Sequence, residues 1–316
     1  CAAQRAPYSA YLNLGRFRIL SASPELFFRL EKSGRITARP MKGTVRRGRW
    51  KEEDEALSRR LYHSEKNRAE NVMIVDLLRH DLGAVAEVGS VRVPSLFDIE
   101  RYRTVFQMTS TVSARLKPGT SLEDLFRALF PCGSITGAPK VSTMNRIAAL
   151  ETTPREIFSG TVGWIAPGGE AVFNVAIRTA WIDTAFRTLR TGAGGGITWD
   201  STDRDEYREV LTKTAFLTEE WPPFQLLETI KYERGTYILL DRHLKRLRDS
   251  AAYFDMPVSE ETIRRLLEEN RPKEDPCVVR LLVSEDGRAE LQWKPMGPPP
   301  PTPCRVALSK RPVSRQ

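Results

Sequence analysis

The sequence has no long hydrophobic run and few cysteines. None of its 316 residues lies in a stretch that approaches the roughly 18 to 20 apolar residues of a membrane-spanning helix. The first residues, 1–5, carry no hydrophobic targeting segment. These absences predict a cytoplasmic protein without a membrane partner. The four cysteines lie far apart and form no CxxC pair, which argues against a disulfide framework and against a structural zinc site.

The chain also lacks a tract of basic residues, although it is basic overall. Its 49 lysines and arginines exceed its 40 acids and give a formal net charge of +9. Residues 46–49, Arg-Arg-Gly-Arg, are soon followed by residues 52–55, Glu-Glu-Asp-Glu. Proteins that bind nucleic acids gather their positive charge or place it beside aromatic platforms. The sequence therefore predicts no nucleic-acid partner, and its mild positive field suits a small dianion better.

Alternating strand-like and helical patterns predict an α+β fold. Short turns such as Pro167-Gly168-Gly169 favour antiparallel pairing of successive strands. The apolar spacing over 52–82 predicts two helices, or one long bent helix, interrupted by a polar stretch at 64–71. Further helices are expected at 122–129, 139–151 and 205–217. Strands are expected at 17–20, 25–30, 35–38, 90–93, 107–114, 160–165, 171–181 and 186–191.

A break in the pattern predicts two domains. Two prolines follow an expected helix near residues 219–223, which places a first domain at 1–219 and a second at 220–316. The chain opens on Cys1 without a methionine and closes on Gln316 within a pattern. We therefore expect a fragment, with the amino-terminal part of the first domain missing and the second domain partial. The second domain is expected to contain a hairpin at 226–232 and 237–240, helices at 243–254 and 260–270, and strands at 278–283 and 289–293.

Two acids and a lysine give the clearest local geometry. On a helix, Glu206, Glu209 and Lys213 fall at i, i+3 and i+7 and share one face. Carboxylate oxygens in that arrangement are ligands that Mg²⁺ takes, and Glu70, just ahead of a strongly apolar run, is a third acid for such a site. An exposed, salt-bridged helix face is the alternative interpretation.

Two further segments suit an anionic ligand. The run Gly192-Ala193-Gly194-Gly195-Gly196 exposes backbone N–H groups that can hold an anion, although a tight turn explains it equally well. Lys42 lies in the segment Pro-Met-Lys-Gly-Thr (40–44) at the end of an expected strand. A lysine becomes a nucleophile when its surroundings leave part of it neutral, and otherwise it is an ordinary surface residue.

Eight short motifs carry a resemblance to a known family. They are S-P-E at 23–25, P-M-K-G-T at 40–44, R-A-E-N with V-D-L at 68–77, P-C-G-S-I-T-G-A-P-K at 131–140, G-T-V-G-W at 160–164, A-I-R-T at 176–179, G-A-G at 192–194 and E-Y-R-E at 206–209. In this order they resemble the chorismate-utilising enzymes, over about residues 11–218. That family includes component I of anthranilate synthase, component I of aminodeoxychorismate synthase and isochorismate synthase.

The resemblance implies a fold and a set of binding residues. The fold is an α/β sandwich of two antiparallel sheets with outer helices and an active site between the sheets. Mg²⁺ is the implied cofactor, with Glu70, Glu206 and Glu209 as its ligands, and it would orient the ring carboxylate of chorismate. The residues implied to bind substrate are Arg178, Lys213, Gly192, Gly194, Ser134, Thr136, Gln107 and Trp164.

Two residues are implied to be catalytic. Glu25 corresponds to the general acid that protonates the departing C4 hydroxyl, so its pKa should be raised enough for it to carry a proton at neutral pH. Lys42 is typical of aminodeoxychorismate synthases, whereas the other branches usually carry alanine there. Its amine is implied to attack C2 as the hydroxyl leaves. Ammonia then displaces it at C4, which gives 4-amino-4-deoxychorismate on the route to p-aminobenzoate and folate.

The resemblance also implies a partner and leaves alternatives. A separate glutamine amidotransferase subunit would supply the ammonia. One alternative is an anthranilate synthase-like enzyme, in which aromatisation follows on the same protein. The other is an inactive basic binding fragment.

The second domain resembles a different family. Residues 228–230, 240–247 and 250–251 are similar to the amino-terminal domain of class IV aminotransferase-like enzymes, which include aminodeoxychorismate lyase. This implies that Arg246 binds the phosphate of pyridoxal phosphate, with a basic amphipathic helix face as the alternative. The Schiff-base lysine should follow residues 306–309, beyond Gln316. Pyridoxal phosphate is therefore expected only in the full-length second domain of a fused synthase and lyase.

Overall fold

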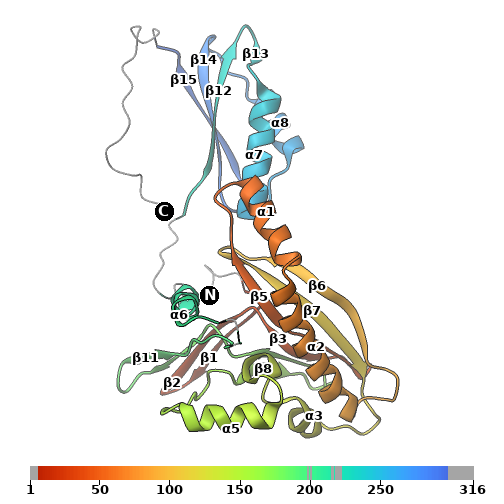
Figure 1. Ribbon diagram of the computed structural model, residues 1–316. Helices are drawn as coiled ribbons and strands as arrows, with labels where there is room; N and C mark the ends of the chain where they lie inside the picture. Colours follow the sequence, from red (N-terminus) through yellow and green to blue (C-terminus); the bar gives the residue numbers. More distant parts are fainter. Residues whose placement is uncertain (1–5, 198, 200, 215–216, 218–222, 298–316) are drawn as a thin grey trace. The chain divides into compact units, whose positions relative to one another are not determined.

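The computed structural model describes residues 6–197, 199, 201–214, 217 and 223–297 (Figure 1). It divides into two compact units, Cys1–Trp221 and Pro222–Gln316. The expected domain boundary falls within residues 218–222, which lie outside the described residues, as do residues 306–309. Among the described helices, none is long and apolar enough to cross a membrane.

The first unit contains two antiparallel sheets, which confirms the predicted fold class. The larger has the strand order β5-β7-β4-β3-β9-β8, with β6 paired to β7, and the smaller has the order β1-β2-β10-β11. The larger sheet consists of β3 (Leu26–Leu30), β4 (Arg35–Arg39), β5 (Met41–Arg46), β6 (Arg92–Arg101), β7 (Val105–Arg115), β8 (Thr161–Ile165) and β9 (Ala171–Val175). The smaller consists of β1 (Tyr8–Leu14), β2 (Phe17–Ser23), β10 (Thr179–Asp183) and β11 (Thr188–Thr191).

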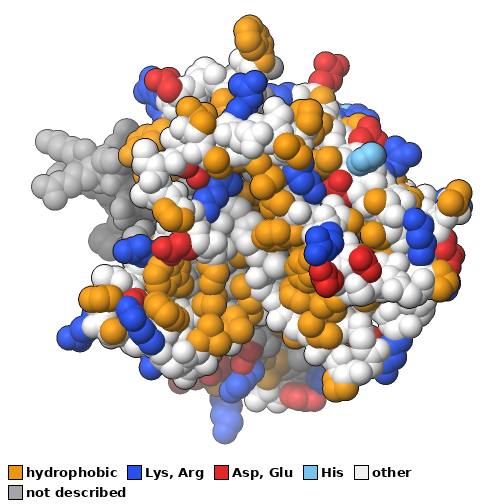
Figure 2. All heavy atoms as spheres, turned by 90° about the horizontal axis from the view of Figure 1, so that it is seen from below, with side chains coloured by type: hydrophobic (Ala, Val, Ile, Leu, Met, Phe, Trp, Pro, Cys, Tyr) orange, Lys and Arg blue, Asp and Glu red, His pale blue; other side chains and the backbone are white. Residues whose placement is uncertain are grey.

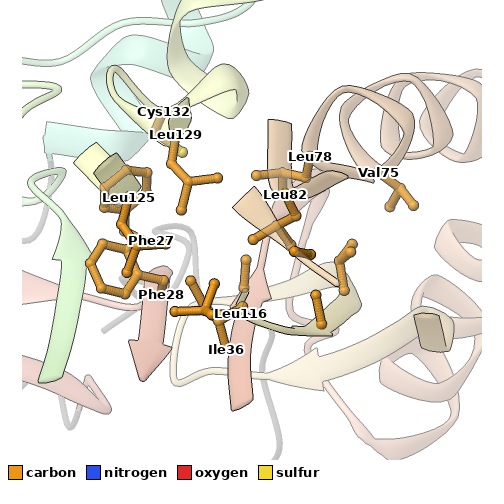
Figure 3. Packing of buried hydrophobic residues seen from close by; sticks show 14 of the residues in the cluster. Phe27, Phe28, Ile36, Val75, Leu78, Leu82, Leu116, Leu125, Leu129 and Cys132 are labelled. Atoms are coloured by element: carbon orange, nitrogen blue, oxygen red, sulfur yellow. The ribbon is translucent and has the colours of Figure 1, made fainter. Parts of the chain in front are cut away.

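The main core of the first unit lies between the larger sheet and two of the helices, α2 and α3 (Figure 3). The helices are α1 (Lys51–Tyr62), α2 (Glu65–Val85), α3 (Leu122–Leu129), α4 (Gly133–Thr136), α5 (Lys140–Leu150) and α6 (Asp203–Thr214). α3 begins at a capping box, because Ser121 and Asp124 each accept a hydrogen bond from the backbone of the other. Apolar side chains of β3, β4, α2 and α3 fill this core, among them Phe27, Phe28, Ile36, Leu78, Leu82, Leu125 and Leu129.

The structure corrects the expected strand at 171–181. Two strands occupy this segment, and they belong to different sheets: β9 lies in the larger sheet and β10 in the smaller. The chain leaves one sheet for the other at residues 176–178, where Arg178 has a φ of 47°. A non-glycine residue in this left-handed region ends a strand. The β-rich sequence on either side gives no sign of the break.

Other boundaries differ from expectation as well. Two helices, α1 and α2, form over the segment 52–82, which is one of the two predicted alternatives, and the break between them lies at residues 63–64. It is shorter than the polar stretch 64–71, because Ser64 accepts a hydrogen bond from the Asn67 N–H and caps α2, which begins at Glu65. The segment that contains Lys42 follows the end of β4 at Arg39, as expected, but Lys42 itself lies in a further strand, β5, which the sequence did not predict. β1 and α4 were not anticipated, and β6 continues well past the expected strand at 90–93.

The second unit is a sheet with two helices. The antiparallel order is β13-β12-β14-β15, and the alternating burial of β12 shows one face packed on a core. The expected strand at 237–240 is shorter, because β13 ends at Tyr237 and a helix begins at Leu240. The elements are β12 (Leu226–Glu233), β13 (Thr236–Tyr237), α7 (Leu240–Phe254), α8 (Glu260–Glu269), β14 (Cys277–Val283) and β15 (Ala289–Pro295). Their buried apolar side chains form a core of their own.

Basic and acidic side chains are interspersed on the molecular surface, as they are along the sequence (Figure 2). Figure 2 shows one face, on which basic and acidic side chains lie singly or in small mixed groups between apolar patches. Several basic residues are paired with acids one helical turn away, such as Arg127 with Glu123 and Arg155 with Glu151. Pairs of this kind contribute little to stability, and they reduce the local field.

Candidate active site

A cavity of about 240 Å³ in the first unit brings together segments that are far apart in the sequence. Its walls come from the start of β3, from β5, α2, β7 and α4, from the crossover before β10, and from the segment between β11 and α6. The larger sheet contributes residues of β5 and β7, and the smaller sheet contributes through the segments that adjoin β10 and β11. The charged side chains in its lining are Glu25, Lys42, Lys66, Glu70, Arg155, Arg178, Glu206, Glu209 and Lys213.

Arg178 lies in the crossover between the two sheets. Its backbone carbonyl accepts a hydrogen bond from the Ala22 N–H at 3.0 Å, which fixes the crossover against β2. Its guanidinium makes no hydrogen bond or ion pair with any other residue that the structure describes, and burial lowers its pKa. A guanidinium remains charged in proteins, so this unpaired cation in a cavity is suited to an anionic ligand.

Glu25 is a buried acid at the wall of the cavity, with 2% of its surface exposed. Its Oε1 accepts a hydrogen bond from the Ser134 hydroxyl at 2.6 Å and from the Met41 N–H at 3.4 Å. Burial raises the pKa of Glu25 to about 6, against the opposing effects of the Ser134 hydroxyl and the Lys42 ammonium. The direction agrees with the expectation of a raised pKa.

The size of the rise does not place the proton on Glu25 at neutral pH. With a pKa of about 6, roughly one Glu25 in ten is protonated at pH 7 in the absence of a ligand. An anionic ligand beside the carboxyl would raise the pKa further, because like charges disfavour ionisation. The expected protonated state therefore requires a bound anion.

Lys42 projects into the same cavity from β5. The pairing of β5 with β7 shifts register between Met41 and Thr44, so Lys42 stands at an irregularity in the strand. A Cβ placed on Gly196 would lie 3.1 Å from Lys42 Nζ, which puts the amine against the glycine run. The half-buried amine forms no hydrogen bond or ion pair within the described part of the chain. It is available to a ligand.

The glycine run is shaped by its neighbours. A Cβ on Gly192 would lie 2.2 Å from Cγ of Phe158, and a Cβ on Gly195 would lie 2.6 Å from Oε2 of Glu206. At Gly192 only glycine lets the backbone pass so close to the base of a ring, whereas the Glu206 carboxylate beside Gly195 is the end of a flexible side chain and can move. The run therefore forms one wall of the cavity and is more than a flexible turn.

α6 places its acids and its lysine on this wall. The Glu206 carboxylate accepts a hydrogen bond from the Ser201 hydroxyl at 2.6 Å. Lys213 pairs with Glu209 at 2.5 Å and donates to the Gly194 carbonyl at 3.0 Å. The predicted shared face exists, and Lys213 ties the helix to the glycine run.

In the second unit, Arg246 is held by a buried acid. Its Nε donates to Glu228 Oε1 at 2.8 Å, and His243 Nδ1 lies 2.7 Å from Glu228 Oε2. The Arg246 side chain is 65% exposed, whereas that of Glu228 is 3% exposed. The guanidinium is thus oriented while much of it still faces solvent, which is compatible with the predicted contact to a phosphate.

Comparison with known families decides the identity of the first unit. Residues 1–219 match the family described as chorismate binding enzyme, and residues 225–313 match amino-transferase class IV. The chain belongs to the chorismate binding enzyme family. This confirms the resemblance that the motifs carried, including the class IV segment.

Named relatives lie in two branches of the chorismate binding family. Over 209 residues the chain is 44% identical to "Aminodeoxychorismate synthase component 1" of Bacillus subtilis, which covers 66% of this chain and 44% of the relative. It is 45% identical over 224 residues to "Aminodeoxychorismate synthase" of Streptomyces griseus (71% and 30%), and 42% identical over 212 residues to "Anthranilate synthase component 1" of Aquifex aeolicus (67% and 42%). The chain thus spans less than half the length of these relatives.

Solved structures show the same fold. Anthranilate synthase component I from Streptococcus pneumoniae matches with a TM-score of 0.63 and 33% identity, over 69% of this chain and 47% of that one. A putative 2,3-dihydroxybenzoate-specific isochorismate synthase from Bacillus anthracis matches with a TM-score of 0.59 and 25% identity, over 66% and 55%.

The three acids predicted to hold Mg²⁺ line one cavity but do not form a tight cluster. Glu70, Glu206 and Glu209 are all in its lining. Among the described residues no group of three or more His, Cys, Asp or Glu side chains is close enough to hold a metal ion. Mg²⁺ usually takes only one or two protein carboxylates and completes its shell with water and substrate oxygens. The donor chemistry of this cavity therefore fits Mg²⁺, and the ligand set stays a prediction.

Most of the predicted substrate-binding residues line the cavity, and two do not. Gln107 does, and its side-chain oxygen accepts from the Thr44 hydroxyl at 2.9 Å. Thr136 instead donates to the Cys132 carbonyl at 3.1 Å, and Trp164 is 55% exposed on β8 away from the cavity lining. Ser134 reaches the cavity as the partner of Glu25. Thr136 and Trp164 thus lie outside the lining of this cavity.

Several residues that line the cavity were not among the predicted site residues. Lys66 and Asn67 precede Glu70 by one helical turn, so a helix through Glu70 would have placed them on the same face. Arg155 lies at the cavity through a segment that the sequence pattern left unassigned, and it also binds Glu151 and Ser159. With Lys66 and Arg155 included, basic side chains outnumber acidic ones in the lining by five to four.

Proposed function

We propose that the chain aminates chorismate at C4 with ammonia, as the synthase component I of an aminodeoxychorismate synthase, and forms 4-amino-4-deoxychorismate. The observation that carries this proposal is the meeting of an unpaired lysine and a buried acid in one cavity: Lys42 and Glu25, 17 positions apart in sequence and coupled through their charges. Curated relatives that carry the name aminodeoxychorismate synthase support the same branch.

Binding of the substrate follows from the cations. Chorismate is a dianion, and Arg178 offers a charged guanidinium that has no described partner. The amides of the glycine run supply further donors. Mg²⁺ bound by Glu70 and Glu209, with Glu206 directly or through water, would supply charge neutralisation for the ring carboxylate. Lys66 and Arg155 add positive charge to the lining, which favours entry of an anion.

The chemistry uses Lys42 and Glu25 in turn. The neutral Lys42 amine forms a bond to C2, the ring double bond shifts, and the C4–O bond breaks with Glu25 giving its proton, so the hydroxyl leaves as water. Ammonia then forms a bond to C4, the double bond shifts back, and the C2–N bond breaks. Breaking the C2–N bond restores the neutral Lys42 amine, and the one proton that the ammonia nitrogen loses as it becomes the C4 amine returns to Glu25. Two displacements thus replace one difficult step.

Two further inferences concern the source of the ammonia and the role of the second unit. We infer that a glutamine amidotransferase subunit supplies the ammonia, since relatives are named as component 1 of an assembly. We also infer that the full-length second domain binds pyridoxal phosphate, with Arg246 toward the phosphate, and releases p-aminobenzoate as a lyase. The match to amino-transferase class IV over residues 225–313 supports this.

The test is product identification. The protein is incubated with chorismate, ammonium and Mg²⁺, and products are separated by mass, with and without added aminodeoxychorismate lyase. We expect 4-amino-4-deoxychorismate that the added lyase converts to p-aminobenzoate. Anthranilate would place the chain in the branch of its anthranilate synthase relative, and no consumption of chorismate would favour an inactive binding fragment.

A further inference from the structure

Glu25 is linked through Ser134 to a second buried side chain, the thiol of Cys132. The Ser134 hydroxyl donates to Glu25 Oε1 at 2.6 Å, and its oxygen lies 3.1 Å from Cys132 Sγ. A hydroxyl has one proton, so with that proton given to Glu25 the thiol is the donor in the second contact. Burial raises the pKa of Cys132 to about 12, which keeps the thiol protonated. The donors therefore run from Cys132 to Ser134 to Glu25.

This series of donors ends on one oxygen of the carboxyl group. Oε1 accepts from both the Ser134 hydroxyl and the Met41 N–H. Oε2 has no hydrogen-bond partner in the part of the chain that the structure describes, and Glu25 lines the cavity. An oxygen that already accepts two donors is the less basic of the two. A proton added to Glu25 therefore goes to Oε2.

The element that carries Ser134 is fixed before any ligand binds. A Cβ on Gly133 would lie 2.3 Å from Cδ2 of Leu77, so the glycine lets α4 approach α2 closely. Just after α4, Lys140 donates to Asp81 of α2 at 2.7 Å, and both side chains are largely buried. α4 is thus attached to α2 on both sides of the hydroxyl.

We propose that Ser134 is a positioning residue for Glu25: its hydroxyl holds Oε1 and so presents Oε2 as the oxygen that exchanges a proton with the substrate. The inference rests on the proposed function, in which Glu25 protonates the departing hydroxyl. The proton passes from Oε2 to the C4 oxygen as the C4–O bond breaks. The negative charge left on the carboxylate is then stabilised by the Ser134 hydroxyl, because a hydrogen bond to an ionised acceptor is stronger than one to a neutral acceptor.

Other groups also act on Glu25, and the test has to separate them from Ser134. Burial is the largest influence on the pKa of Glu25 and raises it, while Ser134 is the first of the groups that lower it, followed by Lys42 of β5 and, less strongly, Lys213 of α6. The Cys132 thiol faces it from the residue before α4. The remaining charged side chains of the cavity lining are Lys66, Glu70, Arg155, Arg178, Glu206 and Glu209.

The experiment compares Ser134→Ala with Ser134→Thr and with a control, Ser110→Ala. Ser110 is equally buried but donates to Asn71. The protonation of Glu25 is followed by infrared difference spectroscopy of its carboxyl band against pH, with Glu25→Gln as the subtraction reference. In Ser134→Ala the midpoint should rise by about one pH unit or more, since a donor to the ionised form is lost. Ser134→Thr should restore the midpoint, and Ser110→Ala should not move it.

Kinetics give a second, independent reading. With chorismate and ammonium, Ser134→Ala should lower kcat with little change in KM, because the proton donor is misaligned while the substrate contacts remain. A midpoint that moves no further than in Ser110→Ala would overturn the proposal. Cys132→Ala removes only the thiol and keeps the hydroxyl, so it should raise the midpoint by a smaller amount. This variant decides the question if Ser134→Ala does not fold, and an unmoved midpoint then counts against the proposal.

The failure of the proposed function would look different. A wild-type protein that consumes no chorismate would contradict the amination chemistry. The infrared midpoints would still show whether Ser134 holds Oε1, because they need no turnover.

Discussion

At the scale of a single residue, the burial of Glu25 raises its pKa and also affects the stability of the first unit. Its pKa of about 6 lies above that of an ordinary glutamate, chiefly because burial disfavours the charged form. A carboxyl whose pKa is raised by folding contributes its stability below the pKa of the unfolded state. That stability is lost as the pH rises through the folded-state value near 6. At neutral pH the ionised Glu25 therefore destabilises the first unit.

Glu25→Gln should remove this penalty. The variant keeps the shape and cannot ionise. Its free energy of unfolding, relative to that of the wild type, should therefore be about 2 kcal/mol larger at pH 8 than at pH 4, which means a more stable folded state. Urea unfolding at a series of pH values measures the difference. Glu151→Gln serves as the control, because Glu151 is exposed and its pKa is lowered by Arg155, so its pH dependence should have the opposite sign. A difference that does not change with pH would contradict the raised pKa.

In the proposed reaction, Lys42 is the nucleophile. Lys42→Ala should abolish 4-amination, or divert it to another product, because no nitrogen remains to attack C2. Binding of Mg²⁺ should be unchanged, since the three acids are untouched, and calorimetric titration with Mg²⁺ checks this. Lys66→Ala is the matched control, because this exposed lysine lines the same cavity. Its loss should raise KM for chorismate only modestly. An unchanged rate of 4-amination in Lys42→Ala would contradict the proposed role of Lys42 as the nucleophile.

At the scale of elements, the glycine run shows how a wall of the cavity depends on close approach. Gly192→Ala would place a Cβ 2.2 Å from the Phe158 ring, near the rigid base of that side chain. The run must then move, which should cost about 1 to 3 kcal/mol of stability and raise KM for chorismate. Gly194→Ala is the control, since the nearest atom to its Cβ would be 4.0 Å away. Urea unfolding and steady-state kinetics of both variants measure the difference, and equal behaviour would show that the ring does not shape the run.

The elements also show what a sequence can and cannot predict. α3 was expected at 122–129 and lies there, because a capping residue and an amphipathic pattern are both local signals. The segment 171–181 was expected to form one strand and forms two, which lie in different sheets. The break could not be predicted, because the left-handed Arg178 between the strands leaves no mark in the apolar pattern. α4 is too short to show a period.

In the candidate site too, features set by local spacing could be predicted, whereas contacts between residues far apart in the sequence could not. Glu206, Glu209 and Lys213 share a face by spacing alone, and the structure shows that face on the cavity. The resemblance pointed to Glu25, Lys42 and Arg178. The bond between Ser134 and Glu25 joins residues 109 positions apart, so no local pattern carries it. The shared motif predicted Trp164 beside the substrate, but Trp164 is 55% exposed and lies outside the cavity lining, although it shares a face of β8 with the buried Val162.

At the scale of the whole molecule, each unit has its own core and buries carboxylates. The first unit contains Glu25, which forms no ion pair among the described residues. The second contains Glu228, which receives hydrogen bonds from Arg246 and His243. Burial alone raises the pKa of Glu228, but these two partners outweigh it and the net direction is downward. Its contribution to stability is therefore present above the pKa of an unfolded glutamate and is lost as the pH falls.

Glu228→Gln should therefore affect the second unit in the opposite sense to Glu25→Gln in the first. Removing the charge that orients Arg246 and His243 should destabilise the second unit by about 2 kcal/mol at neutral pH, and the loss should shrink in acid, where the wild-type carboxyl is itself protonated. Hydrogen exchange read by mass spectrometry on peptides from 226–295 should show the loss. Peptides from the core of the first unit should keep their protection, because the two cores share no residue. A comparable loss in both sets would mean that the units unfold as one.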